Sequence, residues 1–213
     1  MQSALNELET YIHAESDLPP LIRVALIHYQ FEAIHPFLDG NGRIGRLLVT
    51  LLLCQWKLLP QPLLYLSGFI ERHKSDYYRL LLSVSTQGAW EDWIRYILRG
   101  IATQADDGIR RSHEILALAQ AQRDRLSAER ASATLHHLAD LIVSNPYVTA
   151  AYVAEQLDIS FNAAQSNIQR LVEAGMLNEI TGKSRNRAYV SEKMLAILEA
   201  PEPRQDVAAP GAQ

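Results

Sequence analysis

Apolar residues at helical spacing dominate the first two thirds of the chain. Between residues 4 and 12 they recur three and four positions apart, which predicts an amphipathic helix with Ser3 as its cap. A Pro-Pro pair at 19–20 opens a second helix over residues 21–34, which is apolar nearly all round and suits the centre of a helical bundle. Pro36 ends that helix. The same periodicity predicts further helices over residues 42–56, 67–86 and 89–130.

The pattern changes near Ala131. Three short helices are predicted over residues 135–143, 150–157 and 161–174, and Gly175 closes the third. Two strands, 176–180 and 187–190, follow and are joined by a turn, and three helices with a β-hairpin are typical of a winged helix. We therefore expect a mainly α chain with a helical unit and linker helix over residues 1–131, a winged helix-turn-helix domain over 132–200 and a disordered tail over 201–213.

The overall charge argues against a protein held on nucleic acid by bulk charge. The 213 residues carry a formal net charge of −4, and 48% of them are hydrophobic, as in ordinary globular domains. The one cysteine, Cys54, allows no disulfide framework within the chain. Glu7, Glu9 and Asp17 interrupt any N-terminal signal sequence. The longest apolar run, residues 47–54, is shorter than the roughly 20 residues that span a bilayer. We expect a soluble, cytoplasmic protein that does not enter a membrane.

One loop contains most of the candidate chemistry. It reads His35-Pro36-Phe37-Leu38-Asp39-Gly40-Asn41-Gly42-Arg43-Ile44-Gly45-Arg46. Gly40, Asn41 and Gly42 can take positive φ angles, so that successive backbone N–H groups point into one concavity. A helix starts directly after them and adds its positive dipole end. Arg43 and Arg46 lie three positions apart on its first turn, and the loop is therefore predicted to bind a polyphosphate.

Two further side chains extend this anion site toward catalysis. Asp39 supplies a hard oxygen, and Mg²⁺ is commonly bound through one or two carboxylates together with substrate phosphates. Histidine side chains titrate near neutral pH, so His35 can act as a general base. A base, a metal carboxylate and an anion site together indicate phosphoryl or nucleotidyl transfer to a hydroxyl. Phe37 is expected to be an apolar plug that anchors the loop in the core.

Singly, these features have structural explanations: a histidine before a proline, a Gly-Asn-Gly turn and two arginines on a solvated face are all common. Turn chemistry does not explain their combination within twelve residues. The loop matches the Fic family motif His-Pro-Phe-x-Asp/Glu-Gly-Asn-Gly-Arg-x-x-Arg at every fixed position. Residues 23–34 resemble the helix before that motif, and Tyr65-Leu66-Ser67 and Tyr77-Tyr78-x-x-Leu81 resemble the stretch after it. The resemblance covers residues 1–105 and implies a Fic-type helical bundle, and Fic proteins with a C-terminal winged helix are a known arrangement.

The resemblance implies a protein adenylyltransferase, a nucleotidyltransferase that moves AMP from ATP to a Ser, Thr or Tyr hydroxyl of a target protein and releases pyrophosphate. By position, His35 would be the general base and Asp39 would hold Mg²⁺ between the α and β phosphates. The implied nucleotide-binding residues, with Arg46 at the γ phosphate, are Phe37, Gly40, Asn41, Gly42, Arg43, Arg46, Tyr77 and Tyr78. Tyr77 and Tyr78 match a pair that borders the adenine site, with packing in the helical core as the alternative, and Trp90 and Trp93 are assigned to the core.

Two parts of the family pattern are missing from the chain. Fic enzymes carry a β-hairpin flap, which docks the target segment, upstream of the helix that opens this sequence. Many also carry an inhibitory Ser/Thr-x-x-x-Glu-Gly/Asn motif whose Glu pairs with the second motif arginine. Ser3 and Glu7 have that spacing, but Leu8 follows. We expect the chain to lack the N-terminal flap and inhibitory region, to leave Arg46 free for a triphosphate and to dock target segments poorly.

The predicted third helix of the winged helix has a composition poorly suited to reading DNA. Only one of its polar side chains, Arg170, is basic. The uncharged ones are Asn162, Gln165, Ser166, Asn167 and Gln169. The wing adds Lys183, Arg185 and Arg187, which could reach phosphates, whereas Asp158, Glu173 and Glu179 weaken the positive field. We favour a docking or dimerisation module, with a homodimer as one form of it, and keep DNA binding as the alternative.

Other functions stay open beside the adenylyltransferase. The chain could be a DNA-binding or protein-interaction regulator whose Fic core only senses nucleotide, or a Fic enzyme that uses another donor such as UTP or CDP-choline. His35 favours an enzyme, because a pure sensor needs no base.

Overall fold

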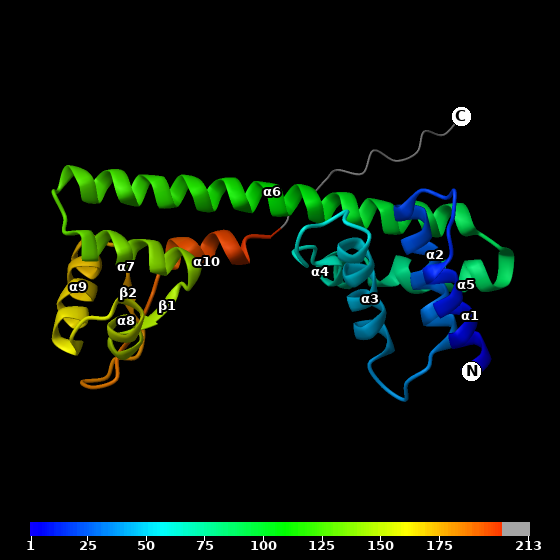
Figure 1. Ribbon diagram of the computed structural model, residues 1–213, viewed down its shortest axis with the longest axis horizontal. Coiled ribbons are helices and arrows are strands. Elements are labelled where there is room, and N and C mark those ends of the chain that lie inside the picture. The colour runs from blue at the N-terminus through cyan, green and yellow to red at the C-terminus, as the bar shows by residue number, and fades with distance from the viewer. Residues whose placement is uncertain (202–213) are drawn as a thin grey trace. The chain divides into compact units, whose positions relative to one another are not determined.

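The computed structural model describes residues 1–201, which fall into two compact units, Met1–Gly108 and the residues from Ile109 onward (Figure 1). The longest helix, α6 (Trp90–Ala128), begins in the first unit and ends in the second. The predicted domain boundary at residue 131 follows the end of this helix, whereas the compact units divide within it. The tail predicted to be disordered lies, apart from Pro201, outside the described residues.

The first unit is entirely helical in its regular elements. Besides the start of α6, it contains α1 (Gln2–His13), α2 (Pro20–Ile34), α3 (Asn41–Gln55), α4 (Leu66–Arg72) and α5 (Lys74–Gln87). Helix α2 packs against both α1 and α3, and α3 packs against α4. The predicted central helix at residues 21–34 is therefore confirmed.

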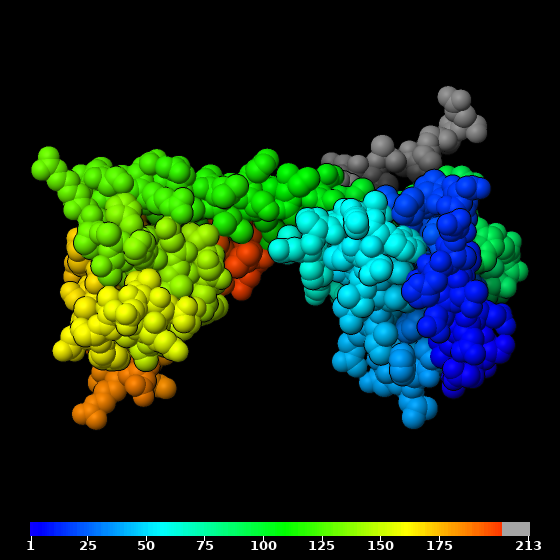
Figure 2. All heavy atoms as spheres, viewed as in Figure 1, coloured from blue at the N-terminus to red at the C-terminus, as the bar shows by residue number. Residues whose placement is uncertain are grey.

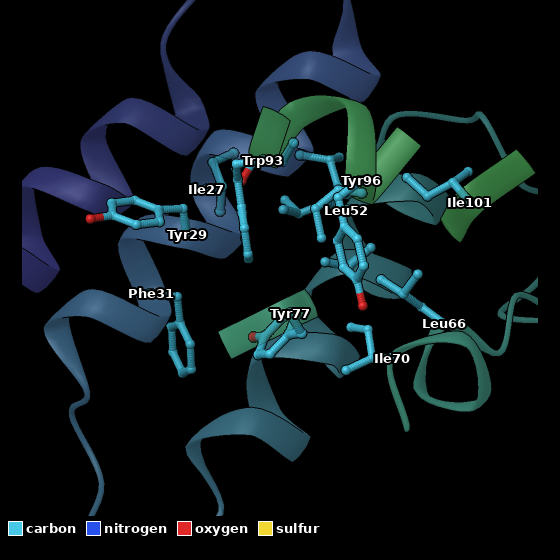
Figure 3. Packing of buried hydrophobic residues seen from close by; sticks show 14 of the residues in the cluster. Ile27, Tyr29, Phe31, Leu52, Leu66, Ile70, Tyr77, Trp93, Tyr96 and Ile101 are labelled. Atoms are coloured by element: carbon cyan, nitrogen blue, oxygen red, sulfur yellow. The ribbon is translucent and has the colours of Figure 1, made fainter. Parts of the chain in front are cut away.

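Helix α2 is central because most of its side chains are apolar on every side. Val24, Ala25 and Ile27 are fully buried, and the indole N–H of Trp93 donates to the carbonyl oxygen of Ala25 at 2.8 Å. This hydrogen bond satisfies a polar group that would otherwise be buried without a partner. Figure 3 shows Trp93 in the buried cluster that also contains Tyr77, with the two rings 5.5 Å apart.

Three expectations about the first unit are wrong in detail. Ser3 does not cap α1, because the helix already begins at Gln2 and the Ser3 hydroxyl donates to Glu7 instead. The single helix expected over residues 67–86 is two helices, because His73 leaves helical geometry with φ −114° and ψ 34°. Trp93 is buried as expected, but Trp90 is 41% exposed and packs edge-on against Tyr29.

The second unit combines short helices with a small sheet. Its elements after α6 are α7 (Ala133–Ser144), β1 (Tyr147–Thr149), α8 (Ala150–Leu157), α9 (Phe161–Glu173), β2 (Asn178–Glu179), β3 (Ala188–Val190) and α10 (Glu192–Glu199). Ser132, Thr149 and Ser160 cap the starts of α7, α8 and α9 by accepting backbone N–H bonds. The predicted winged helix is confirmed, with Gly175 at φ 66° after α9.

The sheet has one strand more than the predicted hairpin. The strand order is β1-β3-β2 and all pairs are antiparallel, with Val148 opposite Tyr189 and Glu179 also opposite Tyr189. Strand β1 has three residues, which is too short for an alternating pattern to be recognised in the sequence. Helix α10 was not predicted either. Among residues 1–201, no helix is both long and apolar enough to cross a bilayer.

Candidate functional site

The loop between α2 and α3 is shaped by two left-handed residues and one asparagine. His35 ends α2 with φ 49° and ψ 59°, and Gly40 precedes α3 with φ 84°. Asn41 is buried, and its amide bonds both backbone groups of Phe37: Oδ1 accepts from Phe37 N at 2.9 Å and Nδ2 donates to Phe37 O at 2.6 Å. The loop is therefore a closed turn that ends at the N-terminus of α3.

The predicted site residues except Phe37 gather around one cavity of about 320 Å³. Its wall is made by His35, Leu38, Asp39, Gly40, Asn41, Gly42, Arg43, Arg46, Ile70, Glu71, Lys74, Tyr77 and Tyr78. The loop and the first turns of α3 form one side, and α4 with α5 forms the other. The unpaired backbone N–H groups and the positive dipole end of α3 thus lie at the same cavity as two arginines and a histidine.

The two motif arginines differ in exposure and in the side chains that bind them. Arg43 is 75% exposed and forms an ion pair with Asp39 at 3.3 Å, which is worth little at such exposure. Arg46 is half-buried, and its Nε donates to Ser67 Oγ at 3.0 Å. Within residues 1–201, no carboxylate forms an ion pair with Arg46. The guanidinium of Arg46 is therefore anchored at one atom, with its other nitrogens available to an anion.

The carboxylate of Asp39 fits a divalent cation only together with a ligand. It is 93% exposed in its side chain, and its Oδ1 accepts the backbone N–H of Gly40 at 2.7 Å. In the part of the chain that the structure describes, no group of three or more His, Cys, Asp or Glu side chains could hold a metal by itself. One carboxylate beside a phosphate-binding helix terminus is a donor set that suits Mg²⁺ bound partly by phosphate oxygens.

The predicted tyrosine pair divides into one buried and one exposed residue. Tyr77 is buried, whereas Tyr78 is 58% exposed, and their rings meet edge to face at 5.4 Å. The Tyr77 hydroxyl is 3.1 Å from Nε2 of His28. Burial raises the pKa of Tyr77, with the charge of Glu32 acting in the same direction. Tyr77 thus packs in the core and also lines the cavity, while its place beside an adenine base stays a prediction.

His28 is a buried polar residue beneath the cavity. Its burial, together with the positive charge of Arg46, lowers its pKa to about 4, so its imidazole is neutral near pH 7. A neutral imidazole can accept at Nε2 the proton that the Tyr77 hydroxyl donates. Its ring also stacks on Trp93 at 5.8 Å. His28 therefore helps to fix Tyr77 and the underside of the site.

Phe37 does not behave as the expected apolar plug. It is 46% exposed, touches Phe31 with a ring-centre distance of 6.3 Å, and does not line the cavity among the described residues. The Asn41 amide, rather than the Phe37 ring, closes the loop. Because the backbone of Phe37 is held by two hydrogen bonds, its ring does not have to be buried for the turn to form.

Sequence reasoning missed three residues on the α4–α5 side of the cavity: Ile70, Glu71 and Lys74. Glu71 and Lys74 form a loose ion pair at 3.8 Å. The signal was present, because 70–71, 74 and 77–78 recur at helical spacing and so share a face with the tyrosine pair. It could not be read as a site without knowing that this face meets the loop before α3.

The second unit has a separate cavity of about 790 Å³ beside its wing. It is lined by Thr149, Ala150, Ala151, Phe161, Gln165, Ser184, Arg185, Asn186 and Arg187. Figure 2 shows the wing, drawn in orange, protruding from the yellow helices of the same unit. The Glu179 carboxylate accepts the backbone N–H groups of Thr181 and Gly182, and the hydrogen bonds from Thr181 lower its pKa. The base of the wing is thereby fixed while two arginines extend beside α9.

Comparison with known proteins agrees with both parts of this description. The sequence profile described as the Fic/DOC family matches residues 1–53, and one described as an HTH DNA binding domain matches residues 135–190. The protein adenylyltransferases Fic of Drosophila willistoni and Drosophila erecta are each 33% identical over 95 residues, which is 44% of this chain and 18% of theirs. The chain therefore spans less than a fifth of the length of the curated relatives it matches.

A crystal structure of a Fic family protein from Desulfovibrio desulfuricans G20 is also similar, with a TM-score of 0.49 and 22% identity. That similarity covers 89% of this chain and 54% of the other. The profile match includes the whole loop from His35 to Arg46 together with α1, α2 and most of α3. Residues 1–53 of this chain are therefore similar to the Fic/DOC family, and a region similar to a helix-turn-helix DNA binding domain follows them at residues 135–190.

Proposed function

We propose that the first unit is a protein adenylyltransferase that transfers AMP from ATP to a hydroxyl side chain of a target protein. The observation that carries this proposal is the single cavity that gathers His35, Asp39, Arg43 and Arg46 at the N-terminus of α3. Such a cavity offers a base, a metal carboxylate and an anion site within reach of one ligand. The relatives named above carry this activity in their names.

In the proposed reaction the hydroxyl oxygen of the target attacks the α phosphorus of ATP. A bond forms between that oxygen and the α phosphorus, and the bond from the α phosphorus to the bridging oxygen of pyrophosphate breaks. His35 accepts the proton of the hydroxyl, and pyrophosphate leaves with the electron pair. The amides at the start of α3 and the two arginines hold the phosphates in line for this attack.

Asp39 would hold Mg²⁺ together with phosphate oxygens, which is the arrangement that its exposed carboxylate fits. When bound, the ion supplies charge that stabilises the phosphates as the bond breaks. Asp39 then has to exchange its contact with Arg43 for the ion, and the high exposure of both side chains makes this exchange inexpensive. On the opposite wall of the cavity, Tyr78 and Ile70 offer apolar surface for the adenine ring of the nucleotide.

The test is incubation of the full chain with α-labelled ATP, Mg²⁺ and a cell lysate. We expect label on protein from the parent chain and none above background from His35→Ala. His13→Ala, which changes an exposed histidine of α1, is the matched control and keeps the label. Parallel reactions with labelled UTP and CDP-choline decide whether another donor is preferred. Equal labelling by His35→Ala and the parent contradicts the proposal.

A second function is favoured by one observation on the second unit. The match to an HTH DNA binding domain coincides with a cavity that places Arg185 and Arg187 beside α9. We propose that these arginines contact nucleic-acid phosphates without selecting a sequence, because the polar side chains of α9 are partly engaged within the chain. Gln165 donates to the Tyr189 hydroxyl at 2.9 Å and Asn167 to the Ala163 carbonyl at 2.8 Å.

Fluorescence anisotropy with a labelled duplex tests this second function. With two or three phosphates contacted, log affinity should fall with log salt with a slope of about −2 to −3. The double variant Arg185→Ala/Arg187→Ala should flatten the slope. A site that is sequence-selective at physiological salt contradicts the prediction, and so does a complete lack of binding at low salt.

A further inference from the structure

Glu32 is a charged residue that the proposed reaction does not use, and it lies directly beneath the site. It is on α2, one turn before His35. Its Oε1 is buried and has no hydrogen-bond partner within residues 1–201. A buried carboxylate oxygen without a partner is destabilising, so this placement calls for a compensating interaction.

Two glycines of α3 make room for this carboxylate. A Cβ added to Gly45 would collide with Glu32 Oε1, and it would also come within 3.2 Å of His28 Cε1 and Phe31 Cδ1. A Cβ on Gly42 would lie 4.0 Å from the same Glu32 oxygen and 3.1 Å from Nη1 of Arg46. Glu32 Oε1 therefore rests against the backbone of the first turns of α3, on the helix that carries Arg46.

The charges around Glu32 oppose the effect of its burial. Burial raises the pKa of the Glu32 carboxyl, whereas the positive charges of Arg46 and then His35, and after them a side-chain hydrogen bond with Tyr77, lower it. The interaction is mutual, because a carboxylate stabilised by a guanidinium stabilises that guanidinium in its observed place. Two interactions thus act on Arg46: Ser67 Oγ accepts from its Nε, and the negative charge of Glu32 attracts it.

We propose that Glu32 is a positioning residue, which keeps the Arg46 guanidinium at the cavity wall for the terminal phosphate of a nucleoside triphosphate. Gly45 makes this arrangement possible, because only a residue without a Cβ leaves room for the Glu32 carboxylate against α3. The phosphate part of the inference rests on the proposed function. The charge interaction between Glu32 and Arg46 does not, and it can be tested without nucleotide.

The first experiment measures the charge interaction between Glu32 and Arg46 in the protein alone. Urea unfolding followed by tryptophan fluorescence compares Glu32→Gln, Arg46→Gln and the double variant with the parent chain. The three tryptophans, Trp56, Trp90 and Trp93, all belong to the first unit, so the signal reports that unit. Coupled residues should give a double variant whose midpoint shift is clearly smaller than the sum of the single shifts. Additive shifts overturn the proposal, whether or not the chain binds ATP.

The second experiment measures nucleotide affinity by calorimetric titration of the full chain. Glu32→Gln keeps the size of the side chain and removes its charge. We expect ATP to bind about three- to tenfold more weakly, which is the effect of losing one partly screened charge interaction, while AMP, which has no γ phosphate, changes less than twofold. Glu9→Gln, which removes an exposed carboxylate of α1, is the control and should change neither affinity.

The remaining outcomes of the titration separate the inference from the proposed function. Tighter ATP binding by Glu32→Gln means that the carboxylate repels the phosphate, and it overturns the inference. An equal loss for ATP and AMP indicates general damage to the fold and also overturns it. If the parent chain binds no nucleotide, the proposed function and the phosphate part of the inference both fail, while the unfolding experiment still tests the charge interaction between Glu32 and Arg46.

Discussion

The side chain of Asn41 bonds both the N–H and the C=O of Phe37, four residues before it. This pair of hydrogen bonds closes the turn between the helix that carries His35 and the helix that carries Arg46. Asn41 is 3% exposed, so water replaces these bonds poorly when the amide is removed. The position of His35 relative to Arg46 therefore depends on the buried side chain of Asn41.

We expect Asn41→Ala to destabilise the first unit by about 1–3 kcal/mol, the range for leaving buried polar groups without partners. Nucleotide binding should weaken in parallel, because the amides at the start of α3 lose their fixed arrangement. Urea unfolding by tryptophan fluorescence measures the first effect and calorimetric titration the second. Asn6→Ala, on the exposed face of α1, is the control. Unchanged stability would show that the turn forms without the amide.

Arg46→Ala should reduce the affinity for ATP about tenfold or more, because a hydrogen bond to a charged group contributes about 1.5–3 kcal/mol. The affinity for AMP should change less than twofold. Arg43→Ala removes an exposed arginine from the same cavity and should weaken both nucleotides alike. The measurement is calorimetry with both nucleotides in the presence of Mg²⁺. If Arg46→Ala weakens ATP and AMP equally, Arg46 does not bind the γ phosphate.

Gly45→Ala should push α3 away from α2, since the new methyl group meets Glu32, His28 and Phe31. Overpacking of this kind typically destabilises a fold by about 1–3 kcal/mol. Gly108→Ala is the matched control, because its Cβ would meet nothing within 4 Å, and alanine in a helix is favoured over glycine by about 1 kcal/mol. Urea unfolding distinguishes the two variants. Equal stabilities would contradict the close approach at Gly45.

The stability of the first unit should fall between about pH 6.5 and pH 4 because of His28. The pKa of His28 is about 4 in the folded chain, against an ordinary value of 6.5 that applies to the unfolded chain. Between these values the unfolded chain binds a proton that the folded chain does not, so each fall in pH favours unfolding. The full effect is on the order of 3 kcal/mol at about 1.4 kcal/mol per pH unit. Glu32, whose pKa is raised by burial, acts in the opposite direction, so the comparison must be made between variants.

The measurement is urea unfolding at pH 7 and pH 5 for the parent, His28→Gln and His137→Gln. His28→Gln should lose the part of the pH dependence that His28 causes, whereas the exposed His137→Gln should keep it. Where His28→Gln folds too weakly for comparison, the same unfolding measurement is made on Tyr77→Phe, which removes only the hydroxyl that bonds the His28 imidazole. A parent chain equally stable at both pH values contradicts the assignment.

The sequence by itself determined the helical bundle, the central place of residues 21–34 and the winged helix. These follow from local physics: apolar periodicity, prolines at helix starts and ends, and a glycine after α9 report on the backbone of their own segment. It also identified the loop from His35 to Arg46, because glycines, an asparagine and two arginines within twelve residues restrict both conformation and charge. The roles assigned to these residues stay predictions.

Only the tertiary structure decided which residues far apart in the sequence share the site. Glu71 and Lys74 reach the cavity, and Ser67 reaches Arg46, because α4 and α5 fold back onto the start of α3, which no local pattern specifies. The break at His73 and the exposure of Phe37 were likewise invisible, since each depends on what neighbouring helices cover. The same holds for Glu32, which reads in sequence as one polar position on an apolar helix. Its placement depends on Gly42 and Gly45 of α3, which have no side chains and so leave the space that the Glu32 carboxylate fills.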